Sequence, residues 1–132
     1  MLEPLPNEKW EILDKEKDYM ISNYGRCYSI KNNRILKPML NNSGYLKYDI
    51  RRMKDGKDIY RKQLLAHVAV VMKFGDKNGN KNITCKYSQI DHIDKNKFHN
   101  TPNNLEIVSP KENCRRRDTV IGSLELCLED IF

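Results

Sequence analysis

The chain has 132 residues, of which 39% are hydrophobic and 32% are charged. This length is typical of one domain, or of two small modules that share a core. No apolar run approaches the roughly 20 residues that a membrane-spanning helix needs, and the acidic start lacks the apolar stretch of a secretory signal. These features exclude membrane, collagen-like and secreted disulfide-rich classes.

Positive charge is concentrated in the middle of the chain. Residues 19–75 carry 12 basic and 3 acidic side chains, and residues 76–117 carry 9 and 5, whereas both ends are acidic. Lys and Arg bind nucleic-acid phosphates by displacing their counterions. A nucleic-acid partner is therefore the first interpretation, and a Lys-rich solvated surface is the alternative.

The cysteines give no local metal-binding pattern, because no C-x-x-C pair occurs among Cys27, Cys85, Cys114 and Cys127. A structural zinc ion is therefore not expected, although Cys85, Cys114 and a histidine leave a composite site open. Reduced thiols that pack as small buried side chains are the favoured interpretation.

Short strands separated by polar turns are predicted over the first half, at residues 19–22, 27–30, 35–40, 45–52 and 58–62. Pro38 predicts an edge strand or a bulge, because proline has no amide proton to donate. Alternation places Leu46, Tyr48 and Ile50 on one face of their strand, and Asp55-Gly56 predicts a hairpin. From about residue 63, helical spacing predicts an amphipathic helix that ends before Gly75.

After a polar linker, the segment 87–117 predicts a strand, a long loop, a second strand and a short helix. Residues 89–93 and 105–108 are the strands, and a loop of this length in a hairpin suggests a function. The helix start is marked by Ser109 as N-cap, Pro110 in the first turn and Glu112 three residues after the cap.

Three polar residues of this segment are suited to metal-dependent hydrolysis. Asp91 and His92 are adjacent on the first strand, and Asn113 falls one turn into the helix. Carboxylate and amide oxygens suit a hard cation such as Mg²⁺. A neutral imidazole beside that cation can remove a proton from water.

Asp91-His92, Asn104 and Asn113 resemble the HNH nuclease motif in its His-Asn-Asn form, as in phage and intron-encoded homing endonucleases. The resemblance implies a ββα-metal fold and one-metal hydrolysis of DNA. It also implies that Asp91 and Asn113 bind Mg²⁺ or Mn²⁺, that His92 is the general base, and that Asn104 fastens the long loop and so holds His92.

Residues 10–74 resemble the small nuclease-associated module that often precedes HNH domains. The features that carry the resemblance are Trp10, the stretch from Tyr19 to Arg26, Gly44-Tyr45 and His67. Val68 stands where that module commonly has Arg, so we expect no phosphate contact there. Many homing relatives continue into a helix-turn-helix region, whereas this chain ends at Phe132, so long sequence-specific recognition is not expected.

Several basic side chains are candidates for contact with DNA phosphates. Arg115, Arg116 and Arg117 either bind phosphate near the cut or complement the dipole of the predicted helix. Along the predicted hairpin, contacts to the DNA backbone would position the protein without reading sequence. These hairpin candidates are Lys47, Arg51, Arg52, Lys54, Arg61 and Lys62.

The remaining polar residues of the two regions have structural interpretations. Turn formation accounts for Asn96, Asn100 and Asn103. His99 is interpreted as a solvated loop residue, and His67, which lies among apolar neighbours, as a packed or capping histidine.

The sequence therefore predicts an α+β protein with a basic β-rich module at 8–75, an HNH unit at 86–117 and an acidic apolar tail at 118–132. The tail is expected to pack on the core or to form a dimer contact. The protein is expected to cut double-stranded DNA inside a cell, as a cytoplasmic or a phage- or virus-encoded enzyme. A monomer would nick, and a homodimer would break both strands. The alternatives are a DNA-binding module with an inactive nuclease fold and, less favoured because aromatic residues are few, an RNA-processing nuclease.

Overall fold

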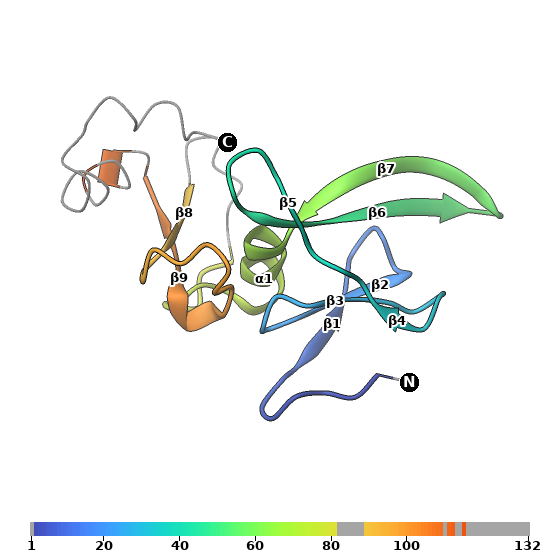
Figure 1. Ribbon diagram of the computed structural model, residues 1–132, viewed down its shortest axis with the longest axis horizontal. Helices are drawn as coiled ribbons and strands as arrows, with labels where there is room; N and C mark the ends of the chain where they lie inside the picture. Colours follow the sequence, from blue (N-terminus) through green and yellow to red (C-terminus); the bar gives the residue numbers. More distant parts are fainter. Residues whose placement is uncertain (1, 82–88, 110, 113–114, 116–132) are drawn as a thin grey trace.

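The computed structural model describes residues 2–81, 89–109, 111, 112 and 115. The described part is a mixed α+β fold with one α-helix and several small sheets, which confirms the predicted class (Figure 1). In chain order the elements are β1 (Trp10–Ile12), β2 (Tyr19–Ser22), β3 (Cys27–Ser29), β4 (Arg34–Ile35), β5 (Met39–Leu40), β6 (Leu46–Lys54), β7 (Lys57–Leu65), α1 (Ala66–Phe74), β8 (Gln89–His92), the 3-10 helix η1 (Pro102–Asn104) and β9 (Leu105–Val108).

All strand pairs described are antiparallel, in three sheets ordered β1-β2-β3-β4, β5-β6-β7 and β8-β9. The longest pair, β6 and β7, forms a curved hairpin that extends from the body of the protein (Figure 1). Asp55 and Gly56 join these strands with φ angles of 52° and 78°. Positive φ at both central residues is the geometry that matches the twist of a hairpin, as the Asp-Gly pair predicts.

Two predicted boundaries differ from the structure. The predicted strand 35–40 is interrupted before Pro38, and its ends belong to different sheets, as β4 and β5. The predicted helix begins later than expected, because Leu64 and Leu65 belong to β7, where they pair with Tyr48 and Lys47. Two adjacent leucines fit either a strand or a helix, so periodicity alone could not place this boundary.

Helix α1 lies between the β8-β9 hairpin and the other two sheets (Figure 1). Its Val70 and Val71 are fully buried, and the predicted inward face of β6 supplies Tyr48 and Ile50 to the same core. Leu105 of β9 is also fully buried in this cluster. The hairpin that carries Asp91-His92 therefore packs on the same core as the first half of the chain.

An ion pair between the buried Glu8 and the partly exposed Arg26 supports the turn between β2 and β3. The Glu8 side chain is fully buried and accepts hydrogen bonds from the Arg26 guanidinium, including one from Nε at 2.8 Å. The guanidinium carbon also lies 5.3 Å from the centre of the Trp10 ring. Burial alone would raise the pKa of Glu8. Hydrogen bonds from Arg26, the Leu5 amide and Ser22 have the larger, opposite effect, and together they lower the pKa from 4.5 to about 2.

Cys27 packs in the core as a small hydrophobic residue, and burial raises the pKa of its thiol to about 12. The other three cysteines lie outside the described residues, including both that could contribute to a composite zinc site, and so does the acidic tail at 118–132. Among the residues that are described, no helix has the length and apolar character needed to cross a membrane.

Replacing Glu8 with Gln should lower the free energy of unfolding at pH 7 by roughly 3 kcal/mol, because Arg26 loses a buried charged partner. The native state holds the pKa of Glu8 at about 2 instead of its ordinary value of 4.5. The stabilisation is therefore complete above about pH 4.5 and is lost as the pH falls toward 2. Urea denaturation should show that the difference in the free energy of unfolding between wild type and Glu8→Gln is smaller at pH 3 than at pH 7. An equal difference at both pH values would contradict this account. The control is Glu11→Gln, because Glu11 is exposed.

Candidate active site

Strand β8 brings Asp91 and His92 to the interior of the protein. Both are buried, with 6% and 5% of their surfaces exposed, and they pair with Glu106 and Leu105 of β9. Because successive side chains of a strand point to opposite faces, and β8 is buried at every position, Asp91 and His92 face different parts of the interior. A buried carboxylate and a buried imidazole therefore occupy consecutive positions of β8, on its two faces, and the charge of Asp91 still acts on His92.

Asn104 joins the two ends of the loop between β8 and β9. Its Oδ1 accepts the Asp94 amide at 3.0 Å, and its Nδ2 donates to Asp94 Oδ1 and to the His99 carbonyl, both at 2.9 Å. Its own carbonyl accepts the Ile93 amide at 2.8 Å. Asn104 is itself buried, so these bonds fix the path of the chain directly after His92.

Asn100 contacts His92 directly, which the sequence interpretation missed. The Asn100 side chain is 2% exposed, and its Oδ1 lies 2.7 Å from His92 Nε2. Asn96 and Asn103, which received the same turn interpretation, are exposed. Three asparagines in one polar loop look alike in sequence, and only the fold distinguishes the one that turns inward.

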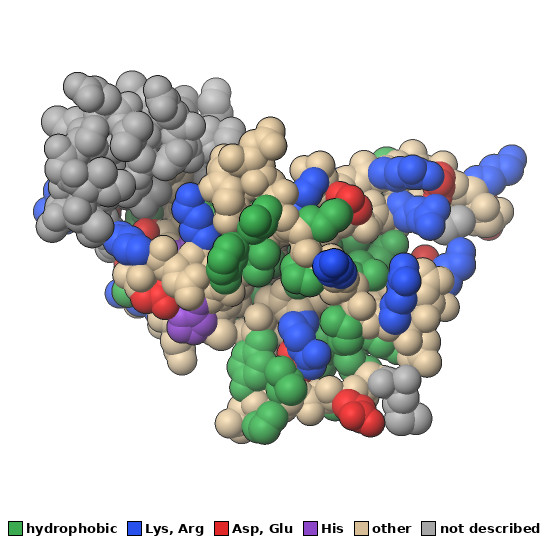
Figure 2. All heavy atoms as spheres, viewed as in Figure 1, with side chains coloured by type: hydrophobic (Ala, Val, Ile, Leu, Met, Phe, Trp, Pro, Cys, Tyr) green, Lys and Arg blue, Asp and Glu red, His purple; other side chains and the backbone are tan. Residues whose placement is uncertain are grey.

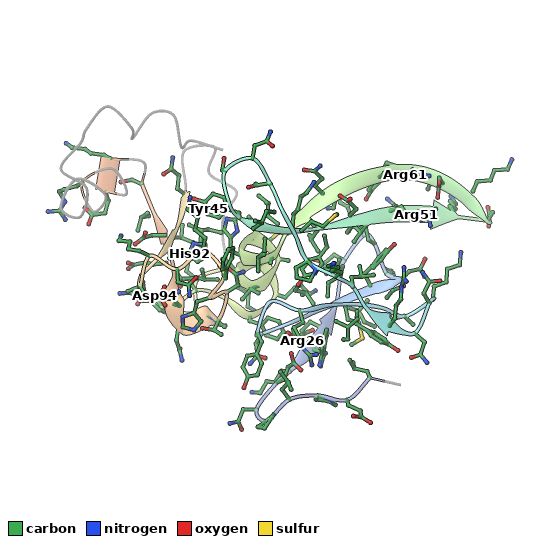
Figure 3. All side chains as sticks on the ribbon, viewed as in Figure 1. Arg26, Tyr45, Arg51, Arg61, His92 and Asp94 are labelled. Atoms are coloured by element: carbon green, nitrogen blue, oxygen red, sulfur yellow. The ribbon has the colours of Figure 1, made fainter. Side chains whose placement is uncertain are left out.

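Two side chains from the first half of the chain line the other side of His92. The Tyr45 ring stacks on His67 at 4.8 Å between centroids, and the centroids of these rings lie 5.8 and 5.3 Å from that of His92. Figure 3 shows Tyr45 and His92 side by side. His67 is 3% exposed, and its Nδ1 has no hydrogen-bond partner among the described residues. His67 is packed, as predicted, but it packs at the site.

Burial keeps the imidazoles neutral. Desolvation lowers the pKa of His92, although the bond to Asn100 and the charge of Asp91 act in the opposite direction. Desolvation and the nearness of His92 lower the pKa of His67 to about 3. A neutral imidazole has a lone pair and can accept a proton, so His92 has the protonation state that a general base requires.

The Asp91 carboxylate has the chemistry of a metal ligand. Its side chain is 7% exposed, and the Lys95 ammonium lies 3.4 Å from Oδ1. A buried carboxylate is stable only beside positive charge, and its oxygens are ligands that hard divalent cations prefer. The described residues contain no group of three His, Cys, Asp or Glu side chains that could hold a metal ion. Asn113 lies outside the described residues.

The segment after β9 begins as the sequence predicts, where it is described. Ser109 Oγ accepts the Glu112 amide at 3.1 Å, the bond expected of a helix N-cap. The Glu112 carboxylate accepts two hydrogen bonds from Arg115, which remains exposed. Arg116 and Arg117 lie outside the described residues.

Arg51 and Arg61 lie on the β6-β7 hairpin, well away from His92 (Figure 3). Arg51 and Arg61 face each other across the strands and share Asp58, with N–O distances of 3.7 and 3.5 Å. Lys47 is largely buried beside Asp49, and Arg52 is exposed. Figure 2 shows Lys and Arg side chains gathered over this hairpin. The structure therefore separates Arg51 and Arg61 from the buried site, whereas Lys47 lies at the base of the hairpin, two residues after Tyr45.

Comparisons with known proteins agree with this geometry. Residues 8–60 match the NUMOD4 motif. The structure superposes on that of the HNH homing endonuclease I-HmuI, whose description reports DNA binding and cleavage, with a TM-score of 0.66 and 29% identity over 86% of this chain and 59% of that one. A curated relative, the uncharacterized HNH endonuclease L245 of Acanthamoeba polyphaga mimivirus, is 33% identical over 101 residues.

The chain is similar to HNH homing endonucleases. This confirms the resemblance seen in the sequence, including the nuclease-associated module in the first half. The matched region covers 76% of this chain but only 27% of the mimivirus relative. The chain thus spans about a quarter of that HNH relative and 59% of I-HmuI.

Replacing Asn104 with Ala should loosen the loop after His92, because it removes three side-chain hydrogen bonds at once. We expect the free energy of unfolding to fall by roughly 2 kcal/mol and the Asp94 amide to exchange with deuterium faster. The neighbouring Asn103 is exposed, so Asn103→Ala should change the stability by less than about 0.5 kcal/mol. Unchanged exchange at Asp94 in Asn104→Ala would contradict this account of the loop.

Proposed function

We propose that this protein is a metal-dependent DNA endonuclease of the HNH type, with His92 as general base in a ββα-metal unit. One observation carries the proposal. Buried Asp91 and buried, neutral His92 are consecutive residues of β8, and Asn104 fixes the loop that follows, in a chain that is similar to HNH homing endonucleases. An imidazole that accepts a proton and a carboxylate that can bind a metal ion are groups that metal-dependent phosphodiester hydrolysis uses.

In the proposed reaction His92 accepts a proton from water while the water oxygen bonds to phosphorus and the bond from phosphorus to the leaving oxygen breaks. Asp91 and Asn113 would hold Mg²⁺ or Mn²⁺, which supplies positive charge to the phosphate as negative charge develops. Asn104 contributes by holding the loop, which keeps His92 in position before the substrate binds.

DNA binding is assigned to the first half of the chain and above all to the β6-β7 hairpin. Arg51 and Arg61 are like charges directly opposite each other, an arrangement that weakens a strand pair. Asp58 offsets this only in part, at distances of 3.5 Å and more, and a DNA phosphate would offset it further. Further contacts are proposed from Lys47, Arg52, Arg115, Arg116 and Arg117.

The proposed division of labour follows the predicted boundaries, with DNA contact in residues 8–75 and the nuclease unit in residues 86–117. One such unit makes one cut, so a monomer would nick DNA. A homodimer, in which the tail at 118–132 is a candidate contact, would cut both strands.

Cleavage of supercoiled plasmid tests the chemistry. Wild type with Mg²⁺ should produce relaxed circles, and EDTA should stop the reaction. His92→Ala should slow it at least roughly 100-fold while gel-shift affinity for the plasmid persists. The exposed His99 is the matched control, and His99→Ala should cut at close to the wild-type rate. Cleavage by His92→Ala at the wild-type rate would refute the role of His92. Binding without any cleavage would indicate either a DNA-binding module with an inactive nuclease fold or a requirement for a specific target site, which selection from a random duplex library would distinguish.

The dependence of DNA affinity on salt tests the hairpin. Substituting Ala at both Arg51 and Arg61 should weaken binding to all duplexes alike. The slope of log affinity against log salt should fall by about 1 for each phosphate that the variant no longer binds. Arg34 is equally basic and exposed but lies on β4 in another sheet, so Arg34→Ala should leave the slope unchanged. An unchanged slope in the double variant would exclude the hairpin from the DNA interface.

A further inference from the structure

The loop between β8 and β9 touches two turns of the first half of the chain. Lys97 Nζ donates to the Ser43 carbonyl at 2.8 Å in the turn between β5 and β6. At the other end of the loop, Asn100 lies against Gly25 in the turn between β2 and β3. The loop that follows His92 is therefore in contact with residues that match the NUMOD4 motif.

The Asn100 carboxamide contacts one ring nitrogen of His92. Its oxygen, 2.7 Å from Nε2, can only accept a hydrogen bond. This contact favours the tautomer in which Nε2 donates the hydrogen bond, and in that tautomer Nδ1 has the lone pair that a general base needs. Because both side chains are buried, no water competes freely for this bond.

Gly25 is the residue that allows Asn100 to reach this position. A Cβ atom at position 25 would lie 2.9 Å from the Asn100 Cβ, and the φ angle of Gly25 is +83°. Only glycine meets both conditions without strain. The turn itself is fixed, because the Gly25 carbonyl accepts the Tyr48 hydroxyl at 2.7 Å and its amide bonds to the Ser22 carbonyl at 2.9 Å.

We propose that Asn100 is a positioning residue that sets the tautomer and orientation of His92, and that the Gly25 turn of the first half sets the position of Asn100. This rests on the proposed role of His92 as general base. It gives the NUMOD4 region a second task beside DNA contact: the region completes the geometry of the active site.

Two substitutions at Asn100 in the full chain separate positioning from packing. Leu has a similar shape but no acceptor, whereas Asp keeps an acceptor oxygen. In nicking assays with Mg²⁺, Asn100→Leu should lower kcat about 10- to 100-fold, as expected for loss of a group that orients an active-site imidazole, with KM nearly unchanged. Asn100→Asp should retain most of the wild-type kcat. Wild-type kcat in Asn100→Leu, or equal losses in both variants, would overturn the proposal.

The tautomer can be read without any cleavage, from ¹⁵N chemical shifts of labelled histidine. His92 should carry its proton on Nε2 in wild type and Asn100→Asp, and should show a mixture of tautomers in Asn100→Leu. If the protein cuts DNA but His92 carries its proton on Nδ1, the positioning proposal fails and the nuclease stands. If the proton is on Nε2 but no DNA is cut, the positioning stands and the nuclease fails.

Gly25→Ala and Gly79→Ala test the turn. Gly79 has a similar φ of +76°, but a Cβ there would meet nothing within 4 Å. Both variants should lose stability by about 1 kcal/mol from backbone strain. Only Gly25→Ala should also lower kcat and change the ¹⁵N shifts of His92. Equal effects of the two variants on kcat would overturn the role of the Gly25 turn.

Discussion

Gly25 and Asn100 approach each other more closely than any side chain at position 25 would allow. Local bonds of the β2-β3 turn hold one side of this contact, together with the ion pair of Glu8 and Arg26. On the other side, the Asn100 carboxamide bonds to His92. A chain of contacts thus runs from Glu8 through the partly exposed Arg26 and the buried Gly25 and Asn100 to the imidazole. Because packed interiors transmit small displacements, a shift of this turn would reach His92.

Burial determines the protonation state of His92. The rings of Tyr45 and His67 exclude water from one side of the imidazole, which lowers its pKa and keeps it neutral. The exposed Arg51 and Arg61 of the β6-β7 hairpin lie well away from His92 (Figure 3). In the proposed function, the charge that binds DNA therefore lies apart from the site of proton transfer, so that different residues would set the DNA affinity and the protonation state of His92.

Features specified by local sequence were predictable. The inward face of β6, the Asp55-Gly56 turn and the Ser109 cap follow from alternation, backbone preference and hydrogen-bond chemistry. The start of α1 could not be predicted, because Leu64 fits a strand and a helix equally well. The contact of Asn100 with His92 was missed for a different reason. It depends on packing between segments about 75 residues apart in sequence, and no local pattern distinguishes Asn100 from the exposed asparagines of its loop.

A double-mutant cycle between Gly25 and Asn100 tests the account most directly. Nicking rates would be compared for wild type, Gly25→Ala, Asn100→Leu and the double variant. If the turn acts on His92 through the Asn100 carboxamide, the double variant should be no slower than Asn100→Leu, since that bond is already absent. Contacting residues that act in one path give such non-additive effects, whereas independent sites add. Rates that multiply across the two substitutions would contradict the account.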